Sequence, residues 1–456
     1  MVLPIFSACS SFVEVEPPKS QLLDKQVFEE VGTVEAALAG VYTQLREGYG
    51  SLFSGESMSM SLYLAQYTDE LINYNNTNQQ SHGPNFFNHL VYADGEDIAY
   101  MWTAAYNQIY NVNVILEGIA VSTKLPPAKS ASIKGESLFI RALIHFHLVN
   151  LFGDVPYITG TDYLHNRNQA RMPMEEVYQQ VIADLLEAES LCSEDYPSAE
   201  RVRVNKSVVR AFLARVYLYH QEWAKAEDMA TAVIDDPAYV WLDDLSKVFL
   251  KESTGTIWAF KPNLEGSNAE IAFSLLIISN PVPYSRSMNE ELYTAFEFGD
   301  LRKANWVGTY AEGDKAWNFA YKYKIRGNIG DGVNKEYPIV MRLEEQYLIR
   351  AEARAQQDKI AAAQADLNKI RRRADLGDTP AANKAALLDA VLHERQVELF
   401  NEYGHRWFDL KRMGKAAEVL APIKQHWKAT NILLPIPDKE LLVNPKLLPQ
   451  NPGYEL

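Results

Sequence analysis

The feature that most constrains the fold is an apolar periodicity that recurs along most of the 456 residues. Apolar side chains return at intervals of three and four residues, which is the spacing of one helix face. The segments with this spacing are 33–45, 98–119, 137–151, 174–191, 206–234, 341–374 and 385–413. Strand-like runs are few, and the best are 256–260 and 271–278. The sequence therefore predicts a mainly α fold with a few short strands.

Two of these segments share an internal spacing of small residues. Ala214 precedes Ala226 by twelve positions, and Ala351 precedes Ala363 by the same interval. This spacing is typical of tetratricopeptide repeats, in which small residues lie where paired helices cross closely. Helix pairs without repeat ancestry can give it too. Because the two pairs are far apart in the chain, we expect a tetratricopeptide-like scaffold into which other elements are inserted.

Gly, Pro, Asn and Asp gather between the helical segments. They mark loops at 73–95, 153–171, 261–290 and 308–338. Long loops on a rigid scaffold are where binding usually resides. The expected fold class is thus a helical-repeat scaffold with long inserted loops.

Charge and cysteine content exclude several classes. A net charge of -15 argues against a general nucleic-acid binder, because neutralising phosphates needs clustered Lys and Arg. The two cysteines, Cys9 and Cys192, provide neither a disulfide framework nor a thiolate metal cluster. The sequence contains no run of about twenty apolar residues, so we expect any membrane attachment to come from a lipid.

The N-terminal residues offer such an attachment. An apolar run and two small residues, Ser7 and Ala8, precede Cys9, which is the order a bacterial lipoprotein signal peptidase requires. A polar, proline-rich stretch at 10–18 suits a tether. The alternative is an ordinary cysteine near a ragged chain end. Because the segment before Cys9 is short and lacks basic residues, we expect the true start upstream. The predicted division is a signal remnant and tether at 1–18 and a single helical domain at 19–456.

Several short motifs follow one another in a fixed order. They are W-x3-Y-x2-I-x3-N at 102–113, L-F-G-D-V-P at 151–156, D-L-R at 300–302, E-R-x2-E-L at 394–399, G-H-R-W-F-D-L at 404–410 and Q-N-P-G-Y at 450–454. In this order they resemble the SusD/RagB family of Bacteroidetes outer-membrane lipoproteins. Together with Cys9 they cover nearly the whole chain.

The resemblance implies a function and a location. It implies non-catalytic binding of oligo- or polysaccharides at the cell surface and their delivery to a SusC-like, TonB-dependent outer-membrane transporter. It also implies a surface-exposed protein held in the outer membrane by a lipid anchor on Cys9, with no cofactor and no nucleic-acid partner. Capture of peptides, as in the RagB-like branch, is the alternative within the family.

The charged and histidine-containing motifs have a structural interpretation. Six residues alternate in sign at helical spacing and are expected to form ion pairs: Glu394, Arg395, Glu398, Arg406, Asp409 and Arg412. A catalytic carboxylate pair among them is the alternative. His145 and His147 point about 200° apart on a helix, so we expect core or surface histidines and no metal site.

The chemistry of sugar binding selects the candidate ligand residues. An aromatic ring packs against the apolar face of a sugar, while amides, carboxylates and Arg bind its hydroxyls. Two loop regions, roughly 60–100 and 255–335, combine these residue types. The candidates are Asp69, Asn73, Tyr74, Phe86, Tyr284, Arg286, Trp306 and Trp317. Simple loop packing is the alternative for each. Trp102 and Trp407 lie in scaffold motifs and are assigned to the core.

Two other classes of protein compete with a binding protein. A surface glycoside hydrolase needs two carboxylates about 5–10 Å apart across a cleft, and the many acidic residues could supply them. The sequence has none of the common hydrolase, phosphate-binding or dinucleotide motifs, so we do not expect an enzyme. A cytoplasmic repeat adaptor is the third class, and the lipoprotein-like Cys9 argues against it.

Overall fold

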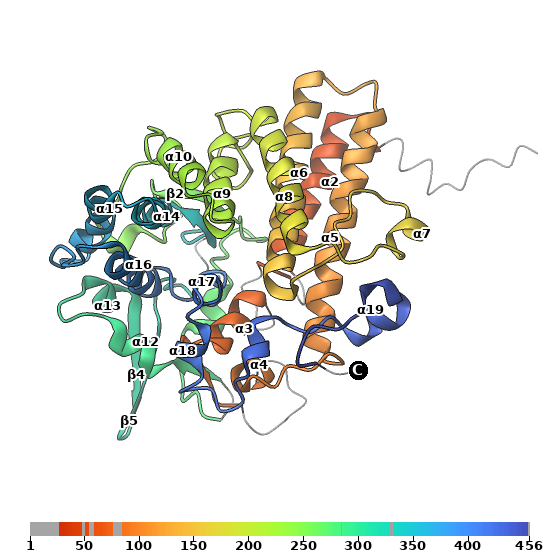
Figure 1. The fold of residues 1–456 in the computed structure, drawn as a ribbon. Coiled ribbons are helices and arrows are strands. Elements are labelled where there is room, and N and C mark those ends of the chain that lie inside the picture. The colour runs from red at the N-terminus through yellow and green to blue at the C-terminus, as the bar shows by residue number, and fades with distance from the viewer. Residues whose placement is uncertain are drawn as a thin grey trace, which may run out of the picture.

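The computed structural model describes residues 27–47, 51–53, 59–75, 84–283, 285–328, 330 and 332–454. Helices dominate these residues, and the strands are short (Figure 1). Cys9, the predicted tether at 1–18 and Tyr284 lie outside the described residues. The prediction of a mainly α fold with few strands is confirmed.

Four long helices form one side of the molecule. They are α2 (Val31–Arg46), α5 (Glu96–Val121), α6 (Pro127–Phe152) and α8 (Met174–Leu191). Their bounds agree with the predicted helical segments within a few residues, except that α6 begins ten residues earlier than the predicted 137. Helix α6 begins at Pro127, where the missing N–H of proline costs nothing, and ends at Gly153 with φ 75°. Its last two turns are completely buried, because neighbouring helices cover it on several sides.

The two predicted repeats form two helix pairs that pack together. The pairs are α9 (Lys206–Tyr219) with α10 (Trp223–Ile234), and α14 (Leu343–Gln356) with α15 (Ile360–Arg373). The four alanines that carry the spacing are completely buried, so the tetratricopeptide-like interpretation is confirmed. Helix α10 contacts α14, although more than one hundred residues separate them. Figure 1 shows these pairs continuing the row of helices that begins with α5 and α6.

A turn separates the two helices of each predicted repeat, as the tetratricopeptide-like spacing requires. Gln221 lies between α9 and α10 with φ 62°, and Asp358 lies between α14 and α15 with φ 59°. A left-handed residue ends a helix because it cannot continue the right-handed backbone. The predicted helix at 385–413 is likewise two helices, α16 (Lys384–Leu399) and α17 (His405–Arg412). The remaining helices are α3 (Met60–Tyr67), α4 (Pro84–Asn88), α7 (Tyr163–Asn166), α11 (Ile271–Leu275), α12 (Glu290–Ala295), α13 (Leu301–Trp306), α18 (Ala416–Leu420) and α19 (Asp438–Val443).

Three antiparallel strand pairs complete the described fold. They are β1 (Leu71–Asn73) with β3 (Arg286–Met288), β2 (Thr256–Ala259) with β6 (Ile339–Arg342), and β4 (Val307–Glu312) with β5 (Lys315–Ala320). The predicted strand at 256–260 is confirmed. The predicted strand at 271–278 is wrong, because its first residues form α11. A short apolar run fits a buried strand and a buried helical turn equally well, so periodicity alone could not separate them.

The core assignments made from the sequence are confirmed. Trp102 and Trp407 are 3% and 1% exposed within one cluster that extends from Phe28 to Leu447. His145 and His147 are buried, and burial lowers the pKa of each to about 3. The His145 Nδ1–H donates to the Arg141 carbonyl oxygen at 2.9 Å, and its Nε2 accepts from the Ile158 N–H at 3.2 Å. Both histidines are therefore neutral core residues.

Candidate functional site

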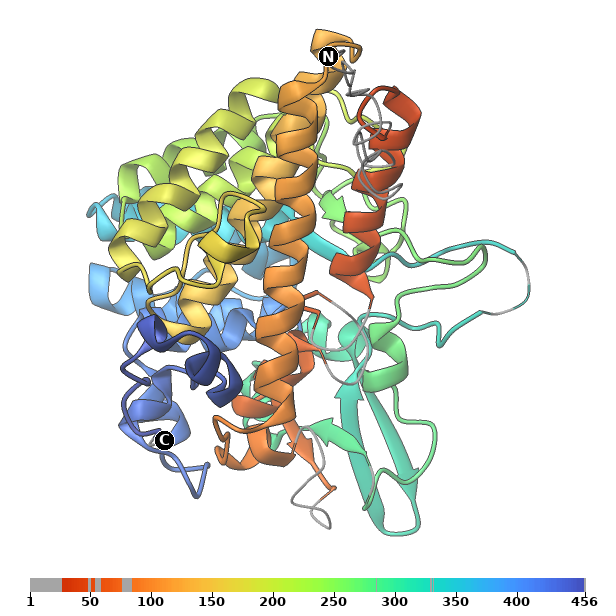
Figure 2. The same ribbon diagram turned by 90° about the vertical axis from the view of Figure 1, so that its right-hand side faces the viewer.

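The two loop regions singled out from the sequence meet in space. Strand β1 comes from the first region and β3 from the second, with Leu71 opposite Met288 and Asn73 opposite Arg286. The β4–β5 hairpin packs beside β3. Figure 2 shows this hairpin projecting from one end of the helical body. Residues more than two hundred positions apart thus build one surface.

A cluster of aromatic side chains lies where the hairpin meets β1. We call it the hairpin aromatic cluster; its members are Tyr74, Tyr310, Trp317, Phe319 and Tyr321, packed with Leu276 and Ile277. The ring centroids of Tyr310 and Trp317 are 6.2 Å apart, and those of Phe319 and Tyr321 are 5.8 Å apart. Trp317 and Phe319 are largely buried, whereas the three tyrosines are half-buried and keep part of their surface accessible.

Strand geometry explains why these rings share a face. Successive side chains of a strand point to opposite faces, so Trp317 and Phe319 lie together. Tyr310 is directly opposite Trp317, and Gly308 is directly opposite Phe319. The ring of Phe319 occupies the space that a Cβ at position 308 would need. Glycine at this position therefore allows the cluster to close over β4.

Polar groups border the cluster. The hydroxyls of Tyr74 and Ser287 are 2.8 Å apart, which connects β1 to β3. The Asn73 Oδ1 accepts from the Asn75 N–H at 2.9 Å. Arg286 lies on β3, one position before Ser287, and is half-buried. Aromatic faces with amide, hydroxyl and guanidinium groups beside them are the chemistry that we associated with sugar binding.

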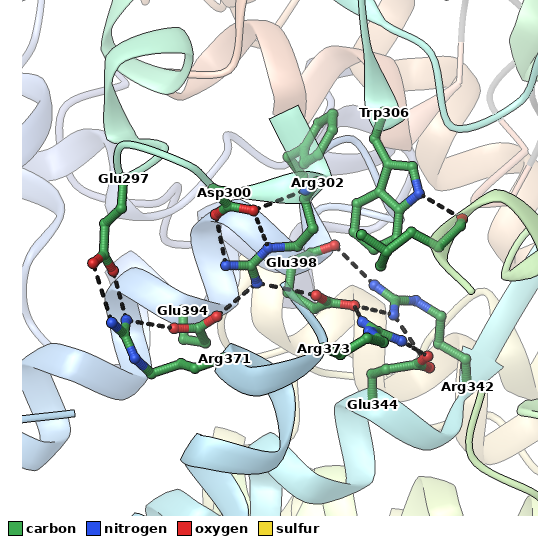
Figure 3. Close-up of polar contacts among 12 residues, drawn as sticks. Glu297, Asp300, Arg302, Trp306, Arg342, Glu344, Arg371, Arg373, Glu394 and Glu398 are labelled. Carbon is green, nitrogen blue, oxygen red and sulfur yellow. Dashed lines mark hydrogen bonds and ion pairs between the residues drawn. The ribbon is translucent and has the colours of Figure 1, made fainter. Parts of the chain in front are cut away.

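The root of the hairpin is anchored by a buried ion-pair network (Figure 3). Helix α13 leads directly into β4, and its Arg302 is completely buried. The Arg302 guanidinium pairs with Asp300 at 2.8 Å, Glu394 at 2.6 Å and Glu398 at 3.1 Å. The last residue of α13, Trp306, donates its indole N–H to the Leu245 carbonyl oxygen at 3.0 Å. The start of β4 is therefore fixed to the helical scaffold.

Glu398 lies at the centre of this network. It also pairs with Arg342 at 2.6 Å and with Arg373 at 2.5 Å. Burial acts to raise the pKa of Glu398, but the guanidiniums of Arg373, Arg342 and Arg302 outweigh it and hold the pKa well below its ordinary value. The network thus joins α13, β6, α15 and α16 through one permanently charged carboxylate.

The other strand of the hairpin is anchored just after it ends. The Lys322 ammonium donates to the carbonyl oxygens of Glu398 and Phe400, each at 2.8 Å, and pairs with Glu402. Burial lowers the pKa of Lys322 to about 8. The Tyr321 N–H donates to the Trp306 carbonyl oxygen at 2.7 Å, which closes the base of the hairpin. The aromatic cluster is therefore held in place at both strands of the hairpin.

The ion-pair interpretation of the charged motifs is confirmed. Besides the contacts of Glu394 and Glu398, Asp409 pairs with Arg395 at 2.7 Å and with Arg412 at 2.8 Å. Arg406 pairs with Asp69 at 2.6 Å. All these side chains are buried or nearly so. Within the described residues, no group of three or more His, Cys, Asp or Glu is arranged to hold a metal ion.

The structure places the predicted ligand residues in different surroundings. Tyr74 and Trp317 belong to the hairpin aromatic cluster, and Arg286 lies on the adjoining strand. Asn73 is 5% exposed, and its amide donates to Gln66. Tyr284 lies outside the described residues. Ligand contact by these residues stays a prediction.

Three of the predicted residues are core in this conformation. Asp69 is 2% exposed and accepts from Arg406 and Gln396. Phe86 is completely buried and stacks on Tyr63 with 4.5 Å between ring centroids. Trp306 is 1% exposed above the ion-pair network. Their packing leaves them no accessible face for a sugar, so direct contact would require them to move.

Sequence reasoning placed Tyr310 in the second loop region without choosing it as a candidate, and did not select Phe319 or Tyr321. The signal was present, because Trp317, Phe319 and Tyr321 alternate with period two after the turn residues Gly313 and Asp314. Gly313 has φ 60°, which a tight hairpin turn requires. The polar composition of 308–338 concealed a hairpin within a segment that was predicted to be a loop.

Fold and site together define a helical-repeat protein that carries an aromatic surface on its inserted segments. One family model, described as "Starch-binding associating with outer membrane", matches residues 11–218, and the model of the SusD family matches residues 256–454. The chain belongs to the SusD family, which associates with the outer membrane and binds glycans. No described helix is both long and apolar enough to cross a membrane.

Individual relatives agree over nearly the whole length. SusD-like protein P25 of Formosa agariphila is 25% identical, covering 99% of this chain and 98% of the relative. A laminarin binding SusD-like protein superposes with a TM-score of 0.76 at 26% identity, covering 92% of this chain and 99% of that one. A SusD superfamily protein from Bacteroides vulgatus has the same fold, with a TM-score of 0.80 at 20% identity, covering 94% and 100%.

Proposed function

We propose that this protein captures oligo- or polysaccharides at the cell surface without cleaving them, and that the hairpin aromatic cluster is the capture site. The observation that carries the proposal is the meeting of Tyr74 with Tyr310 and Trp317, from two distant segments, on an anchored hairpin. The half-buried tyrosines offer ring surface to a sugar, and the hydroxyl of Tyr74 lies beside that surface.

Membership of a glycan-binding family supports the proposal, as does the laminarin binding relative. We further propose that the captured glycan passes to a SusC-like, TonB-dependent transporter, and that a lipid on Cys9 holds the protein in the outer membrane. Incorporation of radiolabelled palmitate into the full-length chain tests the anchor. Loss of label in Cys9→Ala is expected, whereas an unlabelled wild-type chain would contradict the anchor.

The two carboxylates buried at the base of the hairpin, Glu398 and Glu402, are poorly suited to glycoside hydrolysis. A glycosidase needs a raised-pKa acid and a second carboxylate across an accessible cleft. Glu398 and Glu402 instead have lowered pKa values, because the cations around them outweigh the effect of burial; these are three arginines at Glu398, and Arg342 with Lys322 at Glu402. Both are fixed in the network that anchors the hairpin and contribute no accessible carboxylate to the aromatic cluster.

The test is affinity gel electrophoresis of the protein without its tether against a panel of polysaccharides. Peptides are tested in parallel by calorimetry, and reducing ends are assayed throughout. We expect one polysaccharide class to retard the protein with no new reducing ends. Tyr310→Ala and Trp317→Ala should weaken that retardation.

A matched control is available on the scaffold. Tyr347 on α14 pairs with Trp241 at 5.2 Å, as Tyr310 pairs with Trp317 at 6.2 Å. Tyr347→Ala removes a comparable ring pair from the helical scaffold, outside the hairpin aromatic cluster, and should leave retardation unchanged. An equal loss of retardation in Tyr310→Ala and Tyr347→Ala would mean that the hairpin aromatic cluster is not the capture site. Peptide binding alone would favour peptide capture, and new reducing ends would show a hydrolase.

A further inference from the structure

We propose that a second saccharide-binding site runs along helix α5, separate from the hairpin aromatic cluster. Helix α5 lies between the β4–β5 hairpin on one side and α7 and α19 on the other (Figures 1 and 2). The proposal rests on the proposed glycan-binding function and adds a second place where the same class of ligand is held.

The site is a groove formed by two neighbouring cavities. One of about 410 Å³ is bounded by α5, α7 and α19, and the other, of about 590 Å³, continues along α5 toward its C-terminal end. They share Tyr110 and Thr161 in their walls, so they are adjacent along α5, and we refer to the two together as the groove. Its walls extend along α5 from Trp102 to Val121, which is roughly 28 Å at ~1.5 Å per residue. That length suits an extended chain ligand.

Two exposed aromatic rings lie in this groove. Tyr110 is 48% exposed on α5, and Tyr163 is 66% exposed on α7. Helix α7 is held in place at its ends, because the Asp162 side chain accepts from the His165 N–H and the Asn166 amide donates to the Gly160 carbonyl oxygen at 2.8 Å. Accessible rings on ordered elements provide platforms for the apolar faces of sugars.

A half-buried carboxylate supplies the polar part of the groove. The Glu440 carboxylate on α19 has no hydrogen-bond or ion-pair partner among the described side chains, and burial raises its pKa. Its oxygens can accept a hydrogen bond from a hydroxyl of a ligand that lies in the groove. The exposed amide of Asn107 lines the same cavity and offers both a donor and an acceptor.

The balance of charge favours a neutral ligand. Glu117 accepts from the Thr161 N–H at 2.8 Å, and Lys124 pairs with Glu29 at 2.8 Å, so these wall residues are already engaged. Glu440 and Arg167 contribute one charge of each sign, so the walls carry one excess negative charge, that of Glu117, whose partner Thr161 is neutral. The Arg167 guanidinium lies 5.7 Å from the Tyr163 ring centroid, which leaves its N–H groups available to hydroxyls.

The walls also favour a saccharide over a peptide. They consist of helices and short connecting segments and include none of the described strands. An extended peptide binds best to a sheet edge, because its N–H and C=O groups need backbone partners. A saccharide needs only side-chain donors, side-chain acceptors and water. Two sites on one protein would let a single polysaccharide chain bind bivalently.

The test uses the full chain with 3-fluorotyrosine incorporated in place of tyrosine. Its ¹⁹F NMR spectrum is recorded with and without ligand, and the resonances are assigned with single Tyr→Phe variants. The probes are laminarihexaose, cellohexaose, maltohexaose, xylohexaose and mannohexaose. We expect at least one probe to shift the resonances of Tyr110 and Tyr163. Peptides of mixed sequence serve as the competing class of ligand.

The outcomes distinguish this inference from the proposed function. Shifts at Tyr74 and Tyr310 alone would overturn the groove site and leave the proposed function intact. Shifts at Tyr110 and Tyr163 alone would support the groove and contradict the hairpin site. No shift with any saccharide would overturn both, and groove shifts with peptides only would overturn the saccharide assignment.

A second measurement tests the bivalent consequence. The double variant Tyr110→Ala/Tyr163→Ala should weaken retardation by the matching polysaccharide by at least about tenfold, since two-site binding raises avidity by roughly 10²–10⁴. Binding of the hexasaccharide at the hairpin should be unchanged. Unchanged retardation by the polysaccharide would overturn the bivalent role of the groove.

Discussion

Replacing Arg302 with Met removes the central cation from the network that anchors the β4–β5 hairpin. Arg302 is completely buried, and three carboxylates surround its guanidinium. Methionine fills much of the same volume without a charge. The substitution therefore isolates the electrostatic part of the anchor.

The cost follows from the partners that remain. Glu398 keeps Arg342 and Arg373, and Glu394 keeps Arg371 at 3.3 Å. Asp300 keeps its bond from the N–H of residue 302 at 2.8 Å. Breaking a buried ion pair by removing one partner costs about 3–5 kcal/mol. Because each of the three carboxylates retains at least one partner, we expect the lower end of this range, a loss of about 3 kcal/mol in the free energy of unfolding.

The measurement is urea unfolding of the wild type, Arg302→Met and a matched control. Arg372 forms a bidentate ion pair with Asp378 on the exposed surface, with N···O distances of 2.7 and 2.6 Å. Arg372→Met should leave the midpoint unchanged, since solvent screens exposed pairs. Removing a second charge in Arg302→Met/Glu394→Gln should recover part of the loss, because one fewer buried carboxylate is left without its partner.

Binding provides an independent readout of the same change. Because α13 leads directly into β4, loosening its anchor should also weaken polysaccharide retardation in Arg302→Met. Equal midpoints for Arg302→Met and Arg372→Met would refute the idea that the buried network anchors the hairpin. So would a destabilised variant that retains full binding.

Two further substitutions test individual positions. Burial raises the pKa of Glu70 from 4.5 to about 8. The protonated carboxyl of Glu70 therefore contributes stability that is fully present below pH 4.5 and is lost as the pH rises through about 8. Glu70→Gln keeps the acceptor for the Asn401 N–H and cannot ionise. Between pH 4.5 and 8 the urea midpoint of the variant should therefore rise relative to that of the wild type. Midpoints that change in parallel with pH in the two proteins would contradict this. Gly308→Ala should destabilise the protein by about 1–3 kcal/mol, because its Cβ would overlap the Phe319 ring. The control is Gly40→Ala on α2, where a Cβ meets open space, and it should increase the free energy of unfolding by about 0.5–1 kcal/mol. A higher melting temperature for Gly308→Ala than for Gly40→Ala would refute the packing assignment.

Much of the scaffold could be predicted because its signals are local. The twelve-residue spacing from Ala214 to Ala226 reports a crossing between adjacent helices, which the structure confirms. This spacing does not depend on the rest of the chain, since helix geometry relates residues only a few positions apart. The sign alternation around Glu394 and Asp409 predicted that ion pairs form, but most of the partners lie far away in the chain, as Arg302 does for Glu398.

The candidate site was predictable as two regions but not as a set of residues. Trp306 and Trp317 are the same residue type, eleven positions apart, in one region. The first ends α13 and covers the ion-pair network, while the second lies in the hairpin aromatic cluster beside Tyr74. Nothing near either residue in the sequence separates these two surroundings.

By itself the sequence determined the helical class, the repeat pairs, the core tryptophans and the two segments that carry the aromatic residues. Only the tertiary structure decided which of those residues are buried and which partners they have. Asp69 is an example, because its charge is neutralised by Arg406, 337 positions along the chain. Periodicity and capping act over a few residues, whereas burial and charge pairing depend on segments that meet only when the chain has folded.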